Sequence, residues 1–265
     1  MFAWPPSFFA PRPAKAPPGR TEALDVAHLG QTYRVRLRRN AAAKRLILRV
    51  RNDSGEVILT LPKRTTLGTA REFLARHGGW IADRVARLPE QVSFAEGAVV
   101  PLRGDMVRLV SSGQPRGKIA LLPADGERPA TLLVPGDSAH LPRRVQDFYK
   151  AEAKKDIAAA VGRYAAQLNV RIVRISIKDT KSRWGSCSAA GVLSFSWRMI
   201  MAPPDVLDYL AAHEVAHRVE MNHSSRYWNV VAEICPHWQR AESWLTRHGA
   251  GLHRYGPAGG RPAGC

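Results

Sequence analysis

Three histidines and one glutamate near the C-terminal end of the 265-residue chain have the types and spacing of a hydrolytic metal site. His213 and His217 stand at positions i and i+4, so on a helix both imidazoles leave one face about one turn apart. Glu214 leaves the helix beside them, where a carboxylate can hold a water rather than the ion. Zinc in catalytic sites takes three protein ligands and leaves a fourth position to water, whose pKa falls to about 7. A third protein ligand is therefore required.

His223, six residues after His217, is the best candidate for that ligand. The chain must leave the helix between the two histidines, and Asn222 suits a left-handed helix stop, while Ser224 suits the N-cap of a new helix. The spacing equals that of the metzincin pattern H-E-x-x-H-x-x-G-x-x-H, but Glu220 stands where that pattern has glycine. We therefore expect a turn unlike that of a metzincin, one zinc ion per chain, and Glu214 as general base.

The alternative is a chance match of surface histidines, and the apolar character of the helix disfavours it. Polar side chains buried in such a helix need a partner, because burial without one costs on the order of 2 kcal/mol or more per group. The apolar residues lie on more than one face of the helix: Val206, Leu207, Leu210, Ala211, Val215 and Val219.

The elements that must position these residues predict an α+β fold. Short alternating strands are expected at 33–38, 45–51, 57–61, 106–110, 119–122 and 131–134, interrupted by a helical segment at 67–88 that Gly78 and Gly79 would break. A long helix at 142–168, two strands at 172–178 and 192–198, the metal helix and two closing helices follow. We predict a disordered Pro-rich tail at 1–28, a β-rich region at 29–140, a minimal-zincin-like catalytic region at 141–255 and a flexible tail at 256–265.

Further stretches beside the histidine motif point to one known family: residues 38–46, 94–97, 181–188, 193–198, 201–204 and 222–224, with Trp228. Together they resemble the YgjP-like metallopeptidase family, which belongs to the minimal zincins and is similar to the SprT and WLM groups. The resemblance covers about residues 30–255 and implies that His213, His217 and His223 bind zinc and that Glu214 is the general base, the same four residues that the spacing indicates. The family's basic opening segment is matched in a relaxed form, with Ala42 at a position that is often basic.

The polar stretch at residues 181–188 offers substrate-binding candidates in Arg183, Trp184 and Ser186. Arg183 could stabilise an oxyanion or anchor a carboxylate, or it could serve the loop itself by stacking on Trp184 or binding backbone carbonyls. Cys187 as a fourth ligand would close the open position on zinc, so we do not expect it. Three other histidines are expected at the surface or in packing: His237, His248 and His253.

Forty Lys and Arg against 22 Asp and Glu give a net charge of +18, and residues 31–52 carry eight of these bases and no acid. Arg34, Arg36 and Arg38 alternate with apolar residues, which places three guanidiniums on one face of a strand. Such a face either is simply solvated or attracts an anionic partner, a nucleic acid or a nucleotide. No stretch approaches the roughly 18 apolar residues of a membrane span. Three cysteines without framework spacing favour a reducing cytoplasm.

Two classes of hydrolase fit these features. A zinc metallopeptidase would cleave a protein or peptide substrate with a metal-activated water and Glu214 as base. A nucleotide pyrophosphohydrolase would hold phosphates on the basic N-terminal face, but phosphate chemistry usually recruits Mg²⁺ through carboxylates, whereas three imidazoles favour zinc. We therefore expect the peptidase. A third class, a basic nucleic-acid-associated module with structural zinc, would have no water on its metal.

Overall fold

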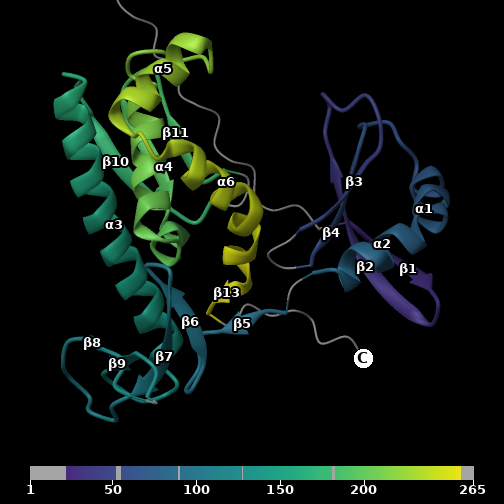
Figure 1. Ribbon diagram of the computed structural model, residues 1–265. Helices are drawn as coiled ribbons and strands as arrows, with labels where there is room; N and C mark the ends of the chain where they lie inside the picture. Colours follow the sequence, from purple (N-terminus) through teal and green to yellow (C-terminus); the bar gives the residue numbers. More distant parts are fainter. Residues whose placement is uncertain (1–21, 52–54, 89, 127, 181–182, 258–265) are drawn as a thin grey trace, which may run out of the picture. The chain divides into compact units, whose positions relative to one another are not determined.

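The structure is a computed structural model that describes residues 22–51, 55–88, 90–126, 128–180 and 183–257 (Figure 1). It divides into two compact units, an N-terminal unit that ends at Arg87 and a C-terminal unit that begins at Leu88. Each unit has its own hydrophobic cluster, so each is described by itself. Among the residues described, no helix has the length and apolar character of a membrane span.

A four-stranded sheet and two helices make up the N-terminal unit (Figure 1). The strands are β1 (Ala23–His28), β2 (Gln31–Arg39), β3 (Ile47–Val50) and β4 (Val57–Leu61), in the order β1-β2-β4-β3. The central pair β2 and β4 is parallel and the outer pairs are antiparallel. Strand β1 falls within the range predicted as a disordered tail, and its Leu24 and Val26 are buried in the core. Residues 1–21 of that range lie outside the described part of the chain.

Helices α1 (Leu67–Arg76) and α2 (Gly78–Ala86) show the break that the glycine pair predicts. They pack on one face of the sheet through Ala70, Leu74 and Ile81. A Cβ on Gly78 would lie 3.2 Å from the Cβ of His28, which is tighter than ordinary van der Waals contact. Glycine at this position therefore permits the close approach of α2 to β1 as well as the change of direction.

Three small sheets belong to the C-terminal unit. One has the order β6-β7-β9-β8, from β6 (Val99–Leu102), β7 (Asp105–Ser111), β8 (Ala120–Leu122) and β9 (Thr131–Val134). The second has the order β10-β12-β11, from β10 (Arg174–Lys178), β11 (Gly185–Cys187) and β12 (Val192–Ser196). The third pairs β5 (Val92–Ser93) with β13 (Tyr255–Gly256). Strands β6 to β9, assigned by the sequence to the region 29–140, thus lie in the same unit as the three histidines.

Four helices complete this unit: α3 (Leu141–Gln167), α4 (Pro204–Ala216), α5 (Ser225–Ile234) and α6 (Trp238–His248). Two 3₁₀ segments, η1 (Trp197–Met201) and η2 (Gly249–Arg254), precede α4 and follow α6. Helix α3 ends at Gln167, and Asn169, which the sequence predicts at the end of this helix, follows two residues later with a φ of 50°. Asparagine tolerates this left-handed backbone better than most side chains, which allows a sharp helix end.

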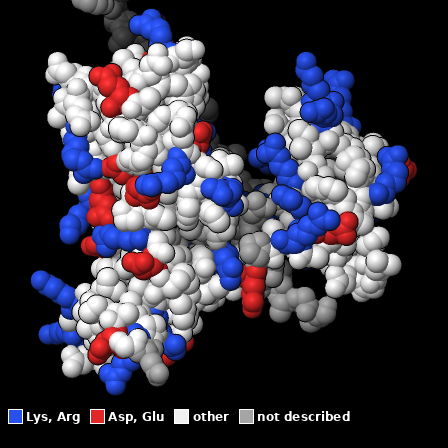
Figure 2. Space-filling view, in the orientation of Figure 1, with Lys and Arg blue, Asp and Glu red and all other residues white. Residues whose placement is uncertain are grey.

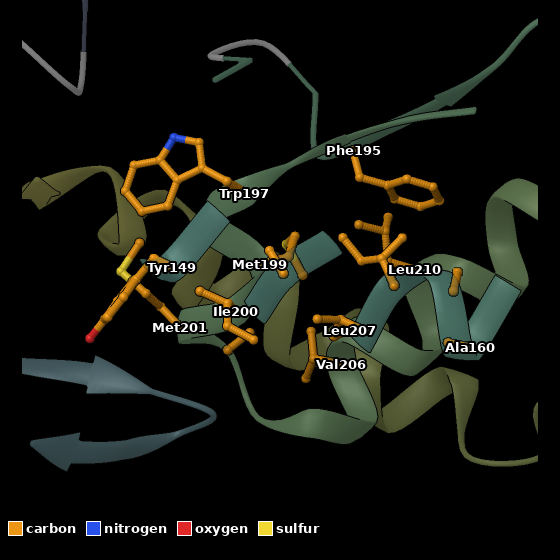
Figure 3. Close-up of a cluster of buried hydrophobic side chains, with 14 of the residues drawn as sticks. Tyr149, Ala160, Phe195, Trp197, Met199, Ile200, Met201, Val206, Leu207 and Leu210 are labelled. Atoms are coloured by element: carbon orange, nitrogen blue, oxygen red, sulfur yellow. The ribbon is translucent and has the colours of Figure 1, made fainter. Parts of the chain in front are cut away.

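The core of this unit is centred on η1 (Figure 3). Strand β12 ends at Ser196 rather than at the predicted position 198, because the Ser196 Oγ accepts a hydrogen bond from the Arg198 backbone and begins the 3₁₀ turn. All five side chains of η1 are consequently buried. Trp197, Met199 and Ile200 pack in one cluster with residues of α3 and α4, which fixes the start of the helix that carries the histidine motif.

Candidate metal centre

Helix α4 brings His213 and Glu214 to its last turn and ends with His217 as its C-cap. The helix begins at Pro204, where a missing N–H costs nothing, and Asp205 lies in its first turn. Most of its other side chains are buried against the rest of the unit, as the apolar sequence predicts. The histidine motif therefore sits on a rigid element rather than on a loop.

The turn after α4 is made by tightening the helix and not by a left-handed residue. The Arg218 N–H donates to the carbonyl of Val215 and the Val219 N–H to that of Ala216, both three residues back. Asn222 is not among the described residues with positive φ, so the predicted left-handed stop at Asn222 is wrong. A 3₁₀-like last turn already redirects the chain, and no left-handed residue is needed. Ser224 caps α5 as predicted, with its Oγ 3.4 Å from the Tyr227 nitrogen.

The three predicted metal ligands converge. Nε2 of His223 lies 3.2 Å from Nε2 of His213, and the His217 ring centroid lies 5.2 Å from that of His213 and 4.8 Å from that of His223. One ligand atom from each residue lies within 4.8 Å of the others. Tetrahedral zinc with Zn–N distances near 2.0–2.1 Å requires nitrogens about 3.3 Å apart. The donor types and the measured separation therefore fit a zinc ion.

Protein groups on the far side of the imidazoles orient them. Nδ1 of His217 lies 3.2 Å from the carbonyl oxygen of Glu220. A carbonyl only accepts, so this contact is a hydrogen bond when Nδ1 carries the proton, which leaves the Nε2 lone pair for a metal. Nδ1 of His213 lies 3.4 Å from the Tyr209 hydroxyl. Glu220, which replaces the metzincin glycine, thus serves the site through its backbone.

Two aromatic residues of α5 hold the histidines from the side. The Tyr227 ring stacks on His217 at 4.6 Å, and its hydroxyl donates to the His213 carbonyl over 3.0 Å. Trp228 stacks on His223 at 5.9 Å. The sequence analysis did not assign Tyr209 or Tyr227 to the site. Tyr209 could have been found from the sequence, because it lies four residues before His213 and therefore on the same helix face. The position of Tyr227 beside the histidines could not, because it depends on how α5 folds back.

Burial favours the uncharged form of His213 and of His217. Burial, followed by the neighbouring imidazoles, lowers the pKa of His213 to about 3. Burial also lowers the pKa of His217 below its usual value. Neutral imidazole is the form that offers a lone pair to a metal, so the protein holds these two residues in the ligand form at neutral pH.

Glu214 is 4% exposed, and burial raises its pKa to about 8, an effect that the nearby positive charge of Arg183 opposes. Its carboxylate occupies space left by Gly185 on β11. A Cβ on Gly185 would lie 2.8 Å from the Glu214 Cδ, and still closer to one carboxylate oxygen. β11 lies within the stretch that the sequence analysis treats as a loop, because three residues without large apolar side chains give no strand signal. Glycine at position 185 allows this edge strand to pass beside the carboxylate.

A pocket of about 540 Å³ opens beside Glu214 and His213. Of the predicted substrate-binding residues, Arg183 and Trp184 line it, whereas Ser186 is half-buried on β11 opposite Ser194 and does not. Trp184 stacks on His253 at 4.7 Å, so a histidine that we expected at the surface or in packing also lines the pocket. Glu242 of α6 contributes a carboxylate to the lining.

A second group among the described residues also brings three potential ligand atoms together: Asp208, Cys235 and His237. Its carboxylate already accepts hydrogen bonds from Tyr164 and Arg163. Burial raises the pKa of the Cys235 thiol to about 11, which keeps it protonated. This group is therefore satisfied by protein donors. The histidine group does not include Cys187.

Comparison with known proteins assigns the chain to a family. The model of the YgjP-like metallopeptidase domain matches residues 44–248. No curated protein matches. The crystal structure of a metallopeptidase zymogen, abylysin of Pyrococcus abyssi, is 20% identical over 37% of this chain and 97% of its own, with a TM-score of 0.33. Because the family match spans more than half of the chain and contains the three converging histidines and Glu214, the protein belongs to the YgjP-like metallopeptidase family.

Proposed function

We propose that the protein is a zinc-dependent metallopeptidase in which His213, His217 and His223 hold one Zn²⁺ and Glu214 is the general base. The observation that carries this proposal is the convergence of three imidazole nitrogens beside a buried carboxylate at the end of α4. Family membership supports a hydrolase that acts on proteins or peptides. Imidazoles alone, without carboxylate ligands, favour zinc over Mg²⁺ or Ca²⁺.

Bound zinc would polarise the scissile carbonyl and lower the pKa of an attacking water. Glu214 would take a proton from that water and later pass it to the leaving amine. Burial raises the pKa of Glu214, and the charge of a bound zinc would lower it again, which would leave the carboxylate able to accept a proton near neutral pH. Gly185 has no side chain and so leaves space for the carboxylate beside β11.

Strand β11 would bind the substrate backbone. It is the edge of its sheet, paired on one side with β12, and it passes the Glu214 carboxylate at Gly185. An extended peptide can add to such an edge through main-chain hydrogen bonds while a neighbouring pocket receives one side chain. The order of long helix, strands, metal helix and closing helices in this unit agrees with a minimal zincin.

The peptidase is favoured over a nucleotide pyrophosphohydrolase by the charges that line the pocket beside Glu214. Among the residues that the structure describes, Arg183 is the only Lys or Arg whose side chain lines the pocket beside His213 and Glu214. A triphosphate at that pocket would meet one guanidinium together with the carboxylates of Glu214 and Glu242, which repel it.

The proposal is tested with zinc-loaded protein incubated in parallel with an unfolded protein substrate and with nucleoside triphosphates. The wild type should cleave the protein, and Glu214→Gln should keep its zinc and its fold while losing most of the hydrolysis, because the carboxylate acts on water and not on the ion. Metal content is measured by elemental analysis and folding by circular dichroism. Activity of Glu214→Gln above about a tenth of wild type would exclude Glu214 as the base. Cleavage of triphosphates alone would exclude the peptidase.

A further inference from the structure

The sheet of the N-terminal unit has one apolar face and one arginine face. Val35, Leu37 and Leu59 point into the core with α1 and α2. On the opposite face the register aligns Arg36 and Arg49, which both pair with Ile58 of the central strand β4. We define the arginine face by the five guanidinium residues of this side: Arg34, Arg36, Arg38, Arg49 and Arg51.

This unit carries an uncompensated positive charge. Its residues 22–51 and 55–87 contain 14 Lys and Arg against five Asp and Glu. Figure 2 shows blue side chains outnumbering red ones on its visible surface. Four further exposed basic residues lie in the loops on either side of β3 and β4: Lys44, Arg45, Lys63 and Arg64.

The acids that are present neutralise only part of the arginine face. Glu56 binds Arg36 at 2.5 Å and Arg51 at 3.5 Å. Arg34, Arg38 and Arg49 are exposed, and none of them forms an ion pair with any residue that the structure describes, although Asp25 is the cross-strand neighbour of Arg34. These three exposed guanidiniums repel one another, and water and salt weaken that repulsion. A bound polyanion would compensate their charge.

From this geometry we propose that the arginine face binds the phosphate backbone of double-stranded nucleic acid. Alternate residues on a strand lie about 7 Å apart, and positions two strands apart lie about 10 Å apart. Arg34, Arg38 and Arg49, which form no ion pair with a described residue, could each hold a phosphate through two parallel hydrogen bonds. A duplex presents one negative charge per about 1.7 Å of its axis, so several of its phosphates can contact the arginine face at once.

The side chains around the arginine face favour a duplex over other anions. Single strands are usually held by bases stacked on aromatic rings, and Tyr33, the aromatic residue of β2, alternates to the apolar face. Binding to an anionic membrane would be strengthened by exposed apolar side chains beside the basic residues. The large exposed ones in this unit, Leu29, Leu67 and Trp80, lie in the β1–β2 turn and on α1 and α2, away from the face. Binding should therefore depend on salt and not on base sequence.

Binding of the full-length chain to a short labelled DNA duplex, followed by fluorescence anisotropy at several salt concentrations, tests this inference. Arg34→Gln, Arg38→Gln and Arg49→Gln combined should weaken binding at low salt by at least tenfold. They should also reduce the slope of log affinity against log salt by about 2 to 3, since each lost phosphate contact contributes about 0.9. Changing the same three residues to Lys should restore the slope, because counterion release depends on charge.

The matched control removes three exposed arginines from the helices of the same unit: Arg71, Arg76 and Arg84 changed to Gln. It has the same net charge as the first variant and should bind the duplex nearly as well as the wild type. Equal weakening of both variants would overturn the proposal in favour of diffuse attraction by net charge. Tighter binding to anionic lipid vesicles than to the duplex would also overturn it. Circular dichroism checks the fold, and the single change Arg38→Gln replaces the triple variant if that variant unfolds.

Discussion

At the metal centre, each imidazole is oriented by a group that the metal itself would not touch. A backbone carbonyl holds the Nδ1 of His217, a tyrosine hydroxyl lies by that of His213, and an indole covers the ring of His223. The Glu220 carbonyl sets the tautomer of His217, and the other two partners restrict the ring planes of His213 and His223 before a metal arrives. The site is therefore preorganised by residues spread over α4, the turn after it and α5.

Replacing His223 with Ala should lower zinc affinity as much as replacing His213 or His217. Loss of a partner behind a ligand typically costs 10-fold to 100-fold in affinity, so loss of a ligand itself should cost more than about 100-fold. Competition with a coloured chelator measures the affinities. His248→Ala, an exposed histidine on α6, is the control and should bind zinc as the wild type does. Unaltered zinc binding by the His223 variant would require another third ligand.

The residues that could be predicted from the sequence are those whose geometry is local. His213, Glu214 and His217 follow from the helical repeat, and His223 from the shortest path that returns to the same ion. Tyr227 and Gly185 could not be predicted, because their roles depend on the folding back of α5 and on the passage of β11 beside α4. The prediction of a left-handed turn at Asn222 was wrong although it rested on a local property, because asparagine tolerates that backbone conformation without requiring it.

At the scale of elements, β11 is the strand on which the proposed chemistry depends most. Its three residues connect the sheet edge, the Glu214 carboxylate and the pocket, yet no periodicity marks them. Helices α3, α5 and α6 were predictable because apolar spacing, capping residues and a terminating Asn, Pro or Gly act within a few positions. Strands as short as β5, β11 and β13 are fixed only by partners distant in sequence.

Gly185→Ala should keep zinc and lose most hydrolysis. The added methyl would displace the Glu214 carboxylate, because the three atoms nearest to it would all belong to Glu214. A displacement near 1 Å of a positioned catalytic group commonly costs about 100-fold in rate. The control is Gly162→Ala on α3, where a methyl meets nothing within 4 Å and should stabilise the helix by about 1 kcal/mol. The values of kcat and zinc content are compared, and an unchanged kcat would show that Gly185 does not position Glu214.

The pocket beside Glu214 should select substrate side chains by charge through Glu242 and Arg183. Neither forms an ion pair with a described residue. Glu242→Gln should weaken cleavage of peptides with Lys or Arg next to the scissile bond by up to about fivefold, the value of a partly exposed ion pair. Arg183→Gln should do the same for Asp or Glu. A peptide library cleaved by both variants measures this, and identical changes in the two profiles would contradict it.

At the scale of the whole molecule, the protein has two hydrophobic cores rather than one. The N-terminal core lies between a sheet and two helices, and the C-terminal core is centred on η1, α3 and α4. The sequence did not reveal that β6 to β9 join the second core. Their strand pattern continues that of the N-terminal unit, and only the burial of Val100, Leu109 and Leu132 with α3 shows where they belong.

Thermal unfolding should consequently show two transitions, of which zinc shifts only one. A ligand that binds the folded state at 100 times its Kd stabilises it by about 2.7 kcal/mol, and all three histidines belong to the C-terminal unit. Differential scanning calorimetry with and without a chelator should therefore move one Tm and leave the other. A single transition that shifts as a whole would mean that the two units unfold together.

The pairing of β5 with β13 affects the order in which the two units fold during translation. Val92 and Ser93 pair with Tyr255 and Gly256, and the Phe94 N–H donates to Gly256 over 2.7 Å. During translation, at about 5–20 residues per second, β5 leaves the ribosome roughly 10 to 30 seconds before its partner exists. The N-terminal unit can fold during that interval. The C-terminal unit, which carries the metal centre, closes only when residues 255–256 emerge, so a stalled or shortened chain would present its first strand unpaired.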